Sequence, residues 1–442
     1  MTKVLLTGDS IIARPFLSEQ KDNPLTQLIQ STPFSFTNLE VLPINFKGHH
    51  AARSDGAHFA APRAVLSDLK AAGFNMFSCA NNHMLDYGET GLKELIKELE
   101  TQNAHYSGIG STLGEASAPV YVDIDDTVVS LLSCASTVFP ETTAGTSNDF
   151  TEGRYGVNPM RFDLEYHLDD ESFRHMSQIF ISLGLDQMMK QSQDLGFVSR
   201  AFESNDEVLY FNDFNHRVQG GINAKFVNSG VNEVKTFVNK KDMARQIEWI
   251  QEAKTRSDIC IVSMHAHESK YERQFPADFI KDFAKQAIDN GADVVVCHGP
   301  HLLRGIEMYE GKPIFYSLGN FIGMNDLVKV LPEGSYERFG IDSALLPSKV
   351  FDLRSEGGTK GFPGVDDFWI TIVPVIEYED GGIKQISLYP VRLKNEKHVA
   401  HRGKPYLVEG NEARHIIEHV KSLSEEFGTK VLMRGNVGIV VL

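Results

Sequence analysis

The sequence is poor in cysteine, and its few cysteines are far apart. Of the 442 residues only four are cysteine, and each lies in or beside an apolar run. They are Cys79, Cys134, Cys260 and Cys297. A disulfide framework or a thiolate metal site needs cysteines at short, paired spacings. We therefore expect four reduced thiols in the protein core and no metal site built on cysteine.

Long hydrophobic runs are also missing. The N-terminal stretch MTKVLLTGDS becomes polar again after three apolar residues, which does not fit a signal peptide or a membrane anchor. Elsewhere no apolar run reaches the roughly 18 residues that a membrane-spanning helix needs. The sequence therefore predicts a cytoplasmic protein without a membrane span.

Positive charge is in short supply. With 43 Lys+Arg against 59 Asp+Glu the formal net charge is −16, and the sequence contains no strong basic patch. Nucleic acids and anionic membrane surfaces would repel such a chain, so we expect no nucleic-acid partner. The remaining composition, 42% hydrophobic and 23% charged, is typical of globular proteins and excludes disordered, collagen-like and coiled-coil chains.

The pattern of apolar residues predicts an α/β architecture. Short apolar runs alternate with longer helical patterns over residues 1–135 and again over 240–325, which is the rhythm of βα units. Between about 140 and 240 this rhythm stops, and one helical segment remains near 172–195, so we expect a helical insertion there. Glycine-rich turns near 357–364 then precede a tail that starts with strand-like alternation.

These changes of pattern give the predicted domains. A chain of 442 residues has room for two or three domains of roughly 150 residues, or for one large α/β domain with insertions. We expect a core over residues 1–340 that carries the insertion at about 140–240. Residues 366–442 should form a small β/α C-terminal extension packed on this core.

Polar side chains follow five predicted strands at the point where each strand ends. They are Asp9 after KVLLTG, Glu40 after FSFTNL, Asn82 and His83 after NMFSCAN, His265 after ICIVSM, and His298 with His301 after VVVC. In open α/β sheets the residues just beyond the carboxyl ends of the strands line the ligand crevice. We therefore expect these residues to converge, although they span most of the chain.

The residue types at these strand ends suit a metal site. Carboxylate, imidazole and amide oxygen together coordinate Mn, Fe or Zn without any thiolate. Two such ions about 3.5–4 Å apart generate a bound hydroxide and stabilise the attacking and leaving oxygens of a displacement. A further imidazole could then protonate the leaving group.

Each of these residues also has an ordinary structural explanation. Asp9 could cap a turn, Glu40 could be a solvated strand end, and Asn82 with His83 could form a turn. The His298-Gly-Pro-His301 segment has the least structural purpose, because it places two histidines in a turn after a buried strand. If the strand before His265 continues, His267 points the opposite way, so one of these two histidines should lie outside the ligand set.

Several motifs in this set occur together in one protein family. They are Gly8-Asp9 with Arg14, Asn38-Leu39-Glu40, Ala80 to Gly88, His265-Ala266-His267-Glu268, and the long run from Ile288 to Phe321. With these motifs the chain resembles the CapA family of bacterial capsule synthesis or poly-γ-glutamate biosynthesis proteins. That family is similar in architecture to the calcineurin-like metallophosphoesterases.

The resemblance implies a four-layer αββα sandwich with a crevice for one or two divalent metal ions, Mn, Fe or Zn. It implies two ligand sets, Asp9, Glu40 and His301 for one ion and Glu40, Asn82, His265 and His298 for the other. It also implies that His83 is the catalytic proton donor. The sequence departs from the phosphoesterases at Ile11, where their first motif has a histidine, and at Glu40, which replaces an aspartate and leaves Asn38 as an alternative bridging residue.

A metal site of this kind would act on an anionic small molecule or polymer. The nearest cations to the motifs are Arg14 and Arg304, and we add His267 and Glu268 as further substrate-binding residues. Arginine fits carboxylate and phosphate equally well, so these residues leave both chemistries open.

The predicted function follows from this site. We expect a metal-dependent hydrolase of the CapA-like class that cleaves a phosphoester or a γ-glutamyl-type amide through a metal-bound hydroxide. The alternative is a non-catalytic accessory protein of capsule or poly-γ-glutamate biosynthesis that binds polymer or a partner enzyme. The oligomeric state stays open.

Overall fold

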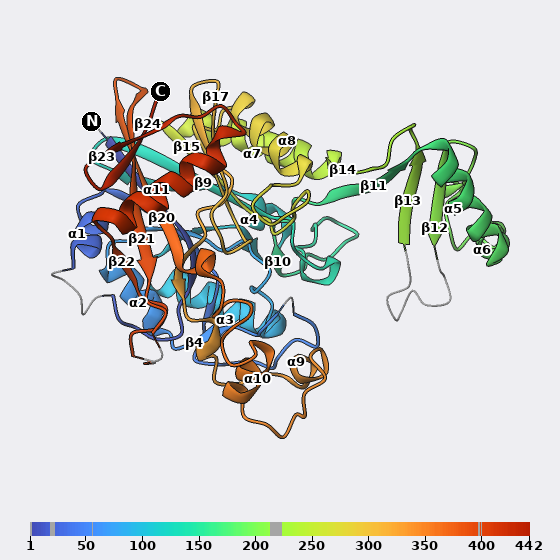
Figure 1. The fold of residues 1–442 in the computed structure, drawn as a ribbon, viewed down its shortest axis with the longest axis horizontal. Coiled ribbons are helices and arrows are strands. Elements are labelled where there is room, and N and C mark those ends of the chain that lie inside the picture. The colour runs from blue at the N-terminus through green and yellow to red at the C-terminus, as the bar shows by residue number, and fades with distance from the viewer. Residues whose placement is uncertain (1, 18–22, 55, 213–222, 397, 399) are drawn as a thin grey trace. The chain divides into compact units, whose positions relative to one another are not determined.

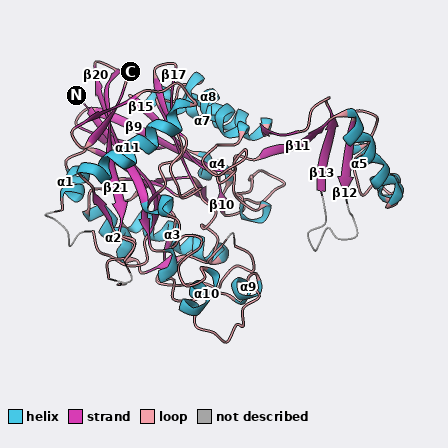
Figure 2. Ribbon diagram, viewed as in Figure 1, coloured by secondary structure: helices cyan, strands magenta, loops and turns pink. Residues whose placement is uncertain are grey.

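The computed structural model describes the chain except for residues 1, 18–22, 55, 213–222, 397 and 399. Its described part divides into two compact units (Figure 1). The large unit consists of Met1–Arg161, Lys240–Pro276 and Phe283–Leu442, and the small unit of Phe162–Asn239 and Ala277–Asp282. Both contain helices and strands, as Figure 2 shows, which confirms the predicted α/β class.

The first sheet of the large unit has the order β23-β24-β21-β20-β1-β2-β5-β6, with β19 paired to β1 and β22 to β21. Its strands are β1 (Thr2–Ile11), β2 (Phe34–Leu39), β5 (Met76–Ser78), β6 (His105–Ser107), β19 (Asn320–Gly323), β20 (Ile370–Glu379), β21 (Gly382–Leu393), β22 (Pro405–Leu407), β23 (Val431–Arg434) and β24 (Val437–Val440). β1 runs parallel to β2 and β19 and antiparallel to β20.

The C-terminal residues are part of this sheet, which corrects the expected extension packed on the core. β20 pairs directly with β1, for example Ile376 with Val4. Most of β20 is buried at successive positions, so both of its faces are covered. Strands that are buried on both faces belong to the interior of a sheet. Residues 366–442 therefore complete the core.

The second sheet has the order β17-β18-β16-β15-β9-β8. Its strands are β8 (Val120–Ile124), β9 (Thr127–Ala135), β15 (Ile259–His265), β16 (Val294–His298), β17 (Ile306–Tyr309) and β18 (Lys312–Phe315). β9, β15 and β16 are parallel neighbours. Because β15 and β16 are buried along their whole length, they read in the sequence as continuous apolar runs.

The two sheets pack face to face. Leu6 and Phe36 of the first sheet share one hydrophobic cluster with Ile261 and Val296 of the second. Successive side chains of a strand point to opposite faces, so Leu5 belongs to a different cluster, together with residues of helices α2 (Ala64–Ala71) and α3 (Gly88–Thr101). Helix α7 (Lys240–Arg256) lies against β9 and β15.

Shorter elements complete the large unit. Its other helices are α1 (Pro24–Gln30), α4 (Leu113–Ser117), α9 (Glu333–Glu337), α10 (Pro347–Arg354) and α11 (Gly410–Glu425), with the 3₁₀ turns Pro140–Thr142, Asn325–Leu327 and Asp366–Trp369. Two strand pairs lie outside the large sheets, β3 (Leu42–Pro43) with β4 (Ala60–Ala61) and β7 (Ile109–Gly110) with β10 (Gly156–Val157). Helix α8 (Asp278–Asp289) contributes residues to both units.

The small unit contains a sheet as well as helices, which corrects the expected helical insertion. Its sheet has the order β12-β13-β11-β14. The elements are β11 (Phe162–Leu168), α5 (Asp170–Ser182), α6 (Leu185–Asp194), the 3₁₀ turn Arg200–Phe202, β12 (Val208–Asn212), β13 (Asn223–Asn228) and β14 (Glu233–Val238). The helices are separated at Gly184, which has a positive φ of 71°. β11 and β14 are at most partly buried along most of their length and carry charged residues, so they lack the continuous apolar runs that mark strands elsewhere.

The beginning of the expected insertion also needs correction. The small unit starts at Phe162, whereas residues 140–161 belong to the large unit. There β10 pairs with β7. The four cysteines are buried and unpaired, as predicted. None of the helices in the described ranges has the length and apolar character that crossing a bilayer requires.

Candidate metal centre

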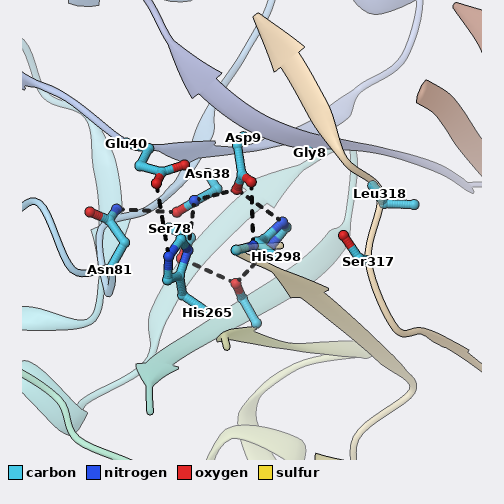
Figure 3. A network of polar contacts seen from close by, with 12 residues as sticks. Gly8, Asp9, Asn38, Glu40, Ser78, Asn81, His265, His298, Ser317 and Leu318 are labelled. Atoms are coloured by element: carbon cyan, nitrogen blue, oxygen red, sulfur yellow. Dashed lines mark hydrogen bonds and ion pairs between the residues drawn. The ribbon is translucent and has the colours of Figure 1, made fainter. Parts of the chain in front are cut away.

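Four of the predicted ligands meet where the two sheets face each other. Asp9 lies near the end of β1, Glu40 follows β2, and His265 and His298 are the last residues of β15 and β16. Figure 3 shows the carboxylates of Asp9 and Glu40 pointing toward the two imidazoles. All four side chains are fully buried. The carboxyl ends of strands from both sheets therefore converge here.

The backbone at Asp9 is held by a close approach of β19. The Asp9 N–H donates to the carbonyl oxygen of Gly319 at 2.9 Å. A β-carbon on Gly8 would collide with that same carbonyl, so only glycine allows this approach. The ladder between β1 and β2 also shifts register at this point. The Gly8-Asp9 motif thus places a carboxylate at a bulge beside the second sheet.

Asp9, Glu40 and His301 form a first candidate ligand group. Each offers one ligand atom, and these atoms lie within 4.8 Å of one another. His301 Nδ1 lies 3.2 Å from Asp9 Oδ2 and 3.0 Å from Asn320 Oδ1. With two oxygen acceptors beside it, Nδ1 carries the proton, so the lone pair of Nε2 faces Glu40 Oε1 at 3.8 Å.

Glu40, His265 and His267 form a second candidate group within the same distance limit. Nε2 of His265 lies 3.2 Å from Nε2 of His267 and 3.9 Å from Glu40 Oε1. His267 was predicted to contact substrate, and one of His265 and His267 was expected to lie outside the ligand set. The imidazole of His267 instead lies beside His265 and Glu40, because the strand ends at His265 and its alternation of side chains does not extend to His267.

The remaining predicted ligands, Asn82 and His298, have buried polar atoms that lack a hydrogen-bond partner among the described residues. These atoms are Asn82 Oδ1 and His298 Nδ1. His298 Nε2 lies 3.2 Å from Ser263 Oγ, while Nδ1 faces Asp9 Oδ1 at 3.9 Å, beyond hydrogen-bond range. Leaving such an atom buried and unsatisfied costs about 1–3 kcal/mol. We call the five residues of the two groups, together with Asn82 and His298, the ligand cluster.

The spacing and protonation of the ligand cluster fit a divalent ion. Two ligand atoms bonded tetrahedrally to one zinc ion lie about 3.4 Å apart. The separations of 3.2 Å between His265 and His267 and 3.8 Å between His301 and Glu40 bracket this value. The side chains present therefore fit a divalent metal ion.

Burial adjusts the protonation of these ligands. It lowers the pKa of His298 to about 4 and the pKa of His265 well below its usual value, in the latter case helped by the charge of His267. Burial alone would raise the pKa of Asp9, but the hydrogen bond and charge of His301 outweigh it, and the net pKa lies below the usual range. Neutral imidazole and ionised carboxylate are the forms that bind metal.

Asn38, the alternative bridging residue, supports Asp9 instead. Its Nδ2 donates to Asp9 Oδ1 at 2.8 Å, and its Oδ1 accepts from Asn81 Nδ2 at 3.3 Å. The amide oxygen of Asn38 thus accepts from Asn81, and its N–H donates to Asp9. Glu40 is left as the carboxylate shared by the two ligand groups.

His83, the predicted proton donor, is oriented by a residue that sequence reasoning missed. Its Nδ1 lies 2.7 Å from Asp86 Oδ2, and its Nε2 lies 3.7 Å from Glu40 Oε1. The carboxylate of Asp86 also accepts from the Phe59 N–H at 2.7 Å and from Ser54 Oγ at 2.8 Å. Asp86 therefore fixes the ring so that Nε2 faces the ligand cluster. It lies within the Ala80 to Gly88 motif, three residues after His83, so a signal was present.

A cavity of about 470 Å³ is lined by His83, His267 and His301. Four cationic residues also line it, and none of them was predicted. They are Arg273, Arg338, Arg354 and Lys360. The last three lie between α9 and the final 3₁₀ turn, in a segment whose glycine-rich turns gave no periodic signal. We call these four residues, together with Gly361, Phe362 and Phe368 of the same lining, the cavity mouth.

Arg304, predicted to bind substrate, is already engaged by the backbone. Its side chain is buried, with 1% of its surface exposed. The guanidinium donates to the carbonyl oxygens of Arg273 at 2.8 Å, His267 at 3.2 Å and Glu268 at 2.9 Å. Arg304 therefore holds the segment that carries His267, and the earlier assignment to substrate is corrected.

The other two predicted substrate residues also lie away from the cavity. The Glu268 carboxylate accepts hydrogen bonds from the hydroxyls of Ser136 and Thr137. Arg14 is half-buried in the segment after β1 and is not one of the described residues that line the cavity. Position after a strand thus predicted which short side chains converge, and it was a poor guide to the direction of long side chains.

Comparisons with known proteins agree on one family. The family model described as "Bacterial capsule synthesis protein PGA_cap" matches residues 3–325. Over 99% of its length the chain is 29% identical to "Uncharacterized protein y4sH" of Sinorhizobium fredii, covering 93% of that protein. It is 24% identical to "PGA biosynthesis protein CapA" of Bacillus subtilis, over 63% of this chain and 50% of that protein.

A shorter match has a different description. Over 102 residues the chain is 36% identical to the "Probable polyglutamine synthesis accessory protein MT0602" of Mycobacterium tuberculosis. This match covers 23% of the chain and 25% of that relative.

Proposed function

Because the chain belongs to the family of bacterial capsule synthesis proteins described as PGA_cap, we propose that it is a metal-dependent hydrolase of this family. The observation that carries the proposal is the pair of ligand groups that share Glu40, with His83 beside them. The substrate we propose is a phosphoester or a γ-glutamyl-type amide. A site with buried carboxylate and neutral imidazole ligands next to an oriented histidine supports this type of chemistry.

We also propose that the large unit is a four-layer αββα sandwich of the metallophosphoesterase type. Its two sheets share a hydrophobic cluster, and helices α2 and α3 contribute to the cluster on the other side of the first sheet. Helix α7 lies along β9 and β15 of the second sheet. This layering supports the resemblance on which the ligand assignment depends.

The ligand cluster would hold one or two ions, Mn, Fe or Zn. We assign Asp9, Glu40 and His301 to one ion, and Glu40, Asn82, His265 and His298 to the other, with His267 as an additional ligand beside His265. A divalent ion bound here would supply Lewis acidity and lower the pKa of a coordinated water. Asn38 keeps Asp9 oriented, since it donates to Oδ1 and leaves Oδ2 toward His301.

His83 is the proposed proton donor to the leaving group. Asp86 accepts from Nδ1, so Nε2 points toward the ligand cluster from a residue that also lines the cavity, and in the imidazolium form Nε2 carries the proton to be donated. When the bond from phosphorus or carbonyl carbon to the leaving atom breaks, this proton passes to the leaving oxygen or nitrogen. The ring of Phe59, whose centroid lies 4.4 Å from that of His83, covers the imidazole on one side.

A direct assay tests this proposal. Purified protein loaded separately with Mn, Zn, Fe(II) or Mg is incubated with p-nitrophenyl phosphate, bis-p-nitrophenyl phosphate and γ-glutamyl-p-nitroanilide. We expect turnover of at least one compound, its loss in Asp9→Asn, and its retention in His415→Ala, which removes an exposed histidine on α11. Equal rates in wild type and Asp9→Asn would contradict the proposal.

A second candidate function is a non-catalytic accessory protein that binds polymer. Two observations favour it. Ile11, at the position of a phosphoesterase histidine, is buried among hydrophobic residues and cannot be a ligand, so the first group has one ligand fewer. One relative is also described as an accessory protein. Binding of poly-γ-glutamate together with no hydrolysis under any of the four metals would support this candidate.

A further inference from the structure

The cavity mouth contains two arginines that lie close together. Arg338 follows α9, and Arg354 is the last residue of α10. Their guanidinium carbons lie 5.9 Å and 4.6 Å from the centroid of the same ring, that of Phe339. Both arginines line the cavity that also contains His83, His267 and His301. Two positive charges are thus gathered around one aromatic side chain.

Other groups in the mouth leave these charges unneutralised. In the described part of the chain no carboxylate forms an ion pair with Arg273, Arg338 or Arg354. The acidic residue in the described cavity lining, Asp326, is itself paired with Arg402 at 2.5 Å. Protein packed around its guanidinium lowers the pKa of Arg354, and the neighbouring charge of Arg338 lowers it further. Repulsion of this kind is relieved when an anion binds between like charges.

Phe362 and Phe368 line the same cavity as these arginines. The rings of Phe362 and Phe368 are stacked, with centroids 5.0 Å apart and an interplanar angle of 8°. Phe362 also meets the ring of His301 edge to face at 6.0 Å. A substrate in contact with His301 would therefore also meet an apolar surface.

We propose that the cavity binds a small molecule, or the end of a chain, with two separate anionic groups. One group lies at the ligand cluster, and the other, a carboxylate or a phosphate, lies between Arg338 and Arg354. The inference rests on the proposed function for the first group and on the arginine pair for the second. The volume of about 470 Å³ is that of a small-molecule site. Arginine's planar fork suits both anionic groups.

The arginine pair lies beyond the part of the chain that the family model matches. The family match ends at residue 325, before both arginines, whereas Asp9, Glu40 and His301 lie inside it. The formal net charge of −16 repels anions from most of the surface. A cationic mouth then selects the substrate that can place its second anionic group there.

Binding of non-hydrolysable phosphonates tests the inference without relying on turnover. The full-length protein, with and without Zn or Mn, is titrated calorimetrically with alkyl monophosphonates and with α,ω-bisphosphonates of increasing spacer length. Phosphonocarboxylates of the same lengths show whether the second group is phosphate or carboxylate. We expect the best two-anion compound to bind about tenfold more tightly than the matching monophosphonate.

Variants assign that preference to residues. Arg338→Ala/Arg354→Ala should abolish the tenfold preference for two-anion compounds, whereas Arg338→Lys/Arg354→Lys should keep part of it. Arg414→Ala, which removes an exposed arginine on α11, should leave the preference intact. Unchanged melting temperatures would show that the variants are folded.

The outcomes separate this inference from the proposed function. If two-anion compounds bind no more tightly than monophosphonates at any spacer length, or if the double alanine variant keeps the preference, the inference is overturned. If metal does not affect monophosphonate binding but the arginine-dependent preference persists, the second anion site stands and the proposed metal-dependent function fails.

Discussion

Asp9, Glu40, His265 and His298 are fully buried at the ends of strands, whereas Arg338 and Arg354 are exposed and follow or end short helices. The first four belong to the ligand cluster and the last two to the cavity mouth. Strand pairing in both sheets holds these four ligands, while Arg338 and Arg354 depend on short helices and loops. Side chains on packed strands are held more rigidly than side chains on loops.

This difference predicts that substitutions in the two regions affect different properties of the protein. The family match from residue 3 to 325 includes the whole ligand cluster, and it excludes Arg338, Arg354 and Phe362. Loops tolerate substitution because few packed contacts depend on them. The comparison therefore predicts large losses of chemistry from changes in the ligand cluster and selective losses of affinity from changes in the cavity mouth.

The largest effect is expected from removing a ligand. Asp9→Asn keeps the shape of the side chain but removes the charge that faces His301 and His298. Metal affinity, measured by titration with Zn or Mn, should fall on the order of a hundredfold or more. Arg338→Ala/Arg354→Ala should bind metal as the wild type does. A similar loss of metal affinity in both variants would contradict the assignment of metal binding to the ligand cluster alone.

Replacing His83, or the Asp86 that orients it, should slow turnover without releasing metal. In His83→Asn we expect kcat to fall by about 10²–10³, since general acid catalysis contributes of that order. Asp86→Asn should cause a smaller loss, because the ring remains but loses its oriented Nδ1 contact. His83→Asn should lose the limb of the kcat–pH profile that reports the acid, and Asp86→Asn should shift that limb to lower pH, because the carboxylate that favours the imidazolium is gone. Unchanged pH profiles would assign these residues a structural role only.

A pair of glycine substitutions compares the stability of the two regions. Gly8→Ala places a β-carbon against the Gly319 carbonyl and should cost about 1–3 kcal/mol of unfolding free energy. Gly361 in the cavity mouth has a positive φ of 63° and no atom within 4 Å of an added β-carbon, so Gly361→Ala should cost about 1 kcal/mol. Urea denaturation measures both. Equal losses of unfolding free energy would contradict tight backbone packing at Gly8 and open space at Gly361.

The smallest effect is expected within the mouth itself. Lys360 lines the cavity but already pairs with Glu356 at 2.6 Å. Lys360→Met should therefore change the affinity for two-anion phosphonates less than about twofold, as expected for an exposed ion pair. A loss as large as that of the arginine pair would show that the whole mouth, and not this pair, attracts the second anion.

Sequence patterns predicted the convergence of the strand-end side chains better than the residues of the cavity mouth, for a physical reason. β15 and β16 are continuous apolar runs, so the polar residue that ends each run is conspicuous, and parallel pairing brings His265 opposite His298. Arg338 and Arg354 lie in a segment without a periodic pattern of apolar residues, so the local sequence does not show which way their side chains point. Arg304 was predicted to bind substrate because it lies three residues after His301, but its side chain donates to a backbone carbonyl oxygen.

Long-range pairing explains the errors in the fold. Val4 at the start of the chain pairs with Ile376, a partner that no local pattern reveals, so the C-terminal strands were taken for a separate extension. In the small unit, β11 and β14 pair along their length although neither is a buried apolar run. Residues 162–168 alternate between apolar and polar side chains, so a strand signal was present there, but it is weaker than the continuous apolar runs of the large unit.

Metal analysis of three purified proteins tests the central claim most directly. Wild type, Asp9→Asn and Arg338→Ala/Arg354→Ala are each incubated with Mn, Fe(II) or Zn, desalted and analysed for bound metal. We predict one or two ions per chain in wild type and in the arginine variant, and a clear loss in Asp9→Asn. Wild type that keeps no metal, or Asp9→Asn that keeps as much as wild type, would contradict a metal centre at these strand ends.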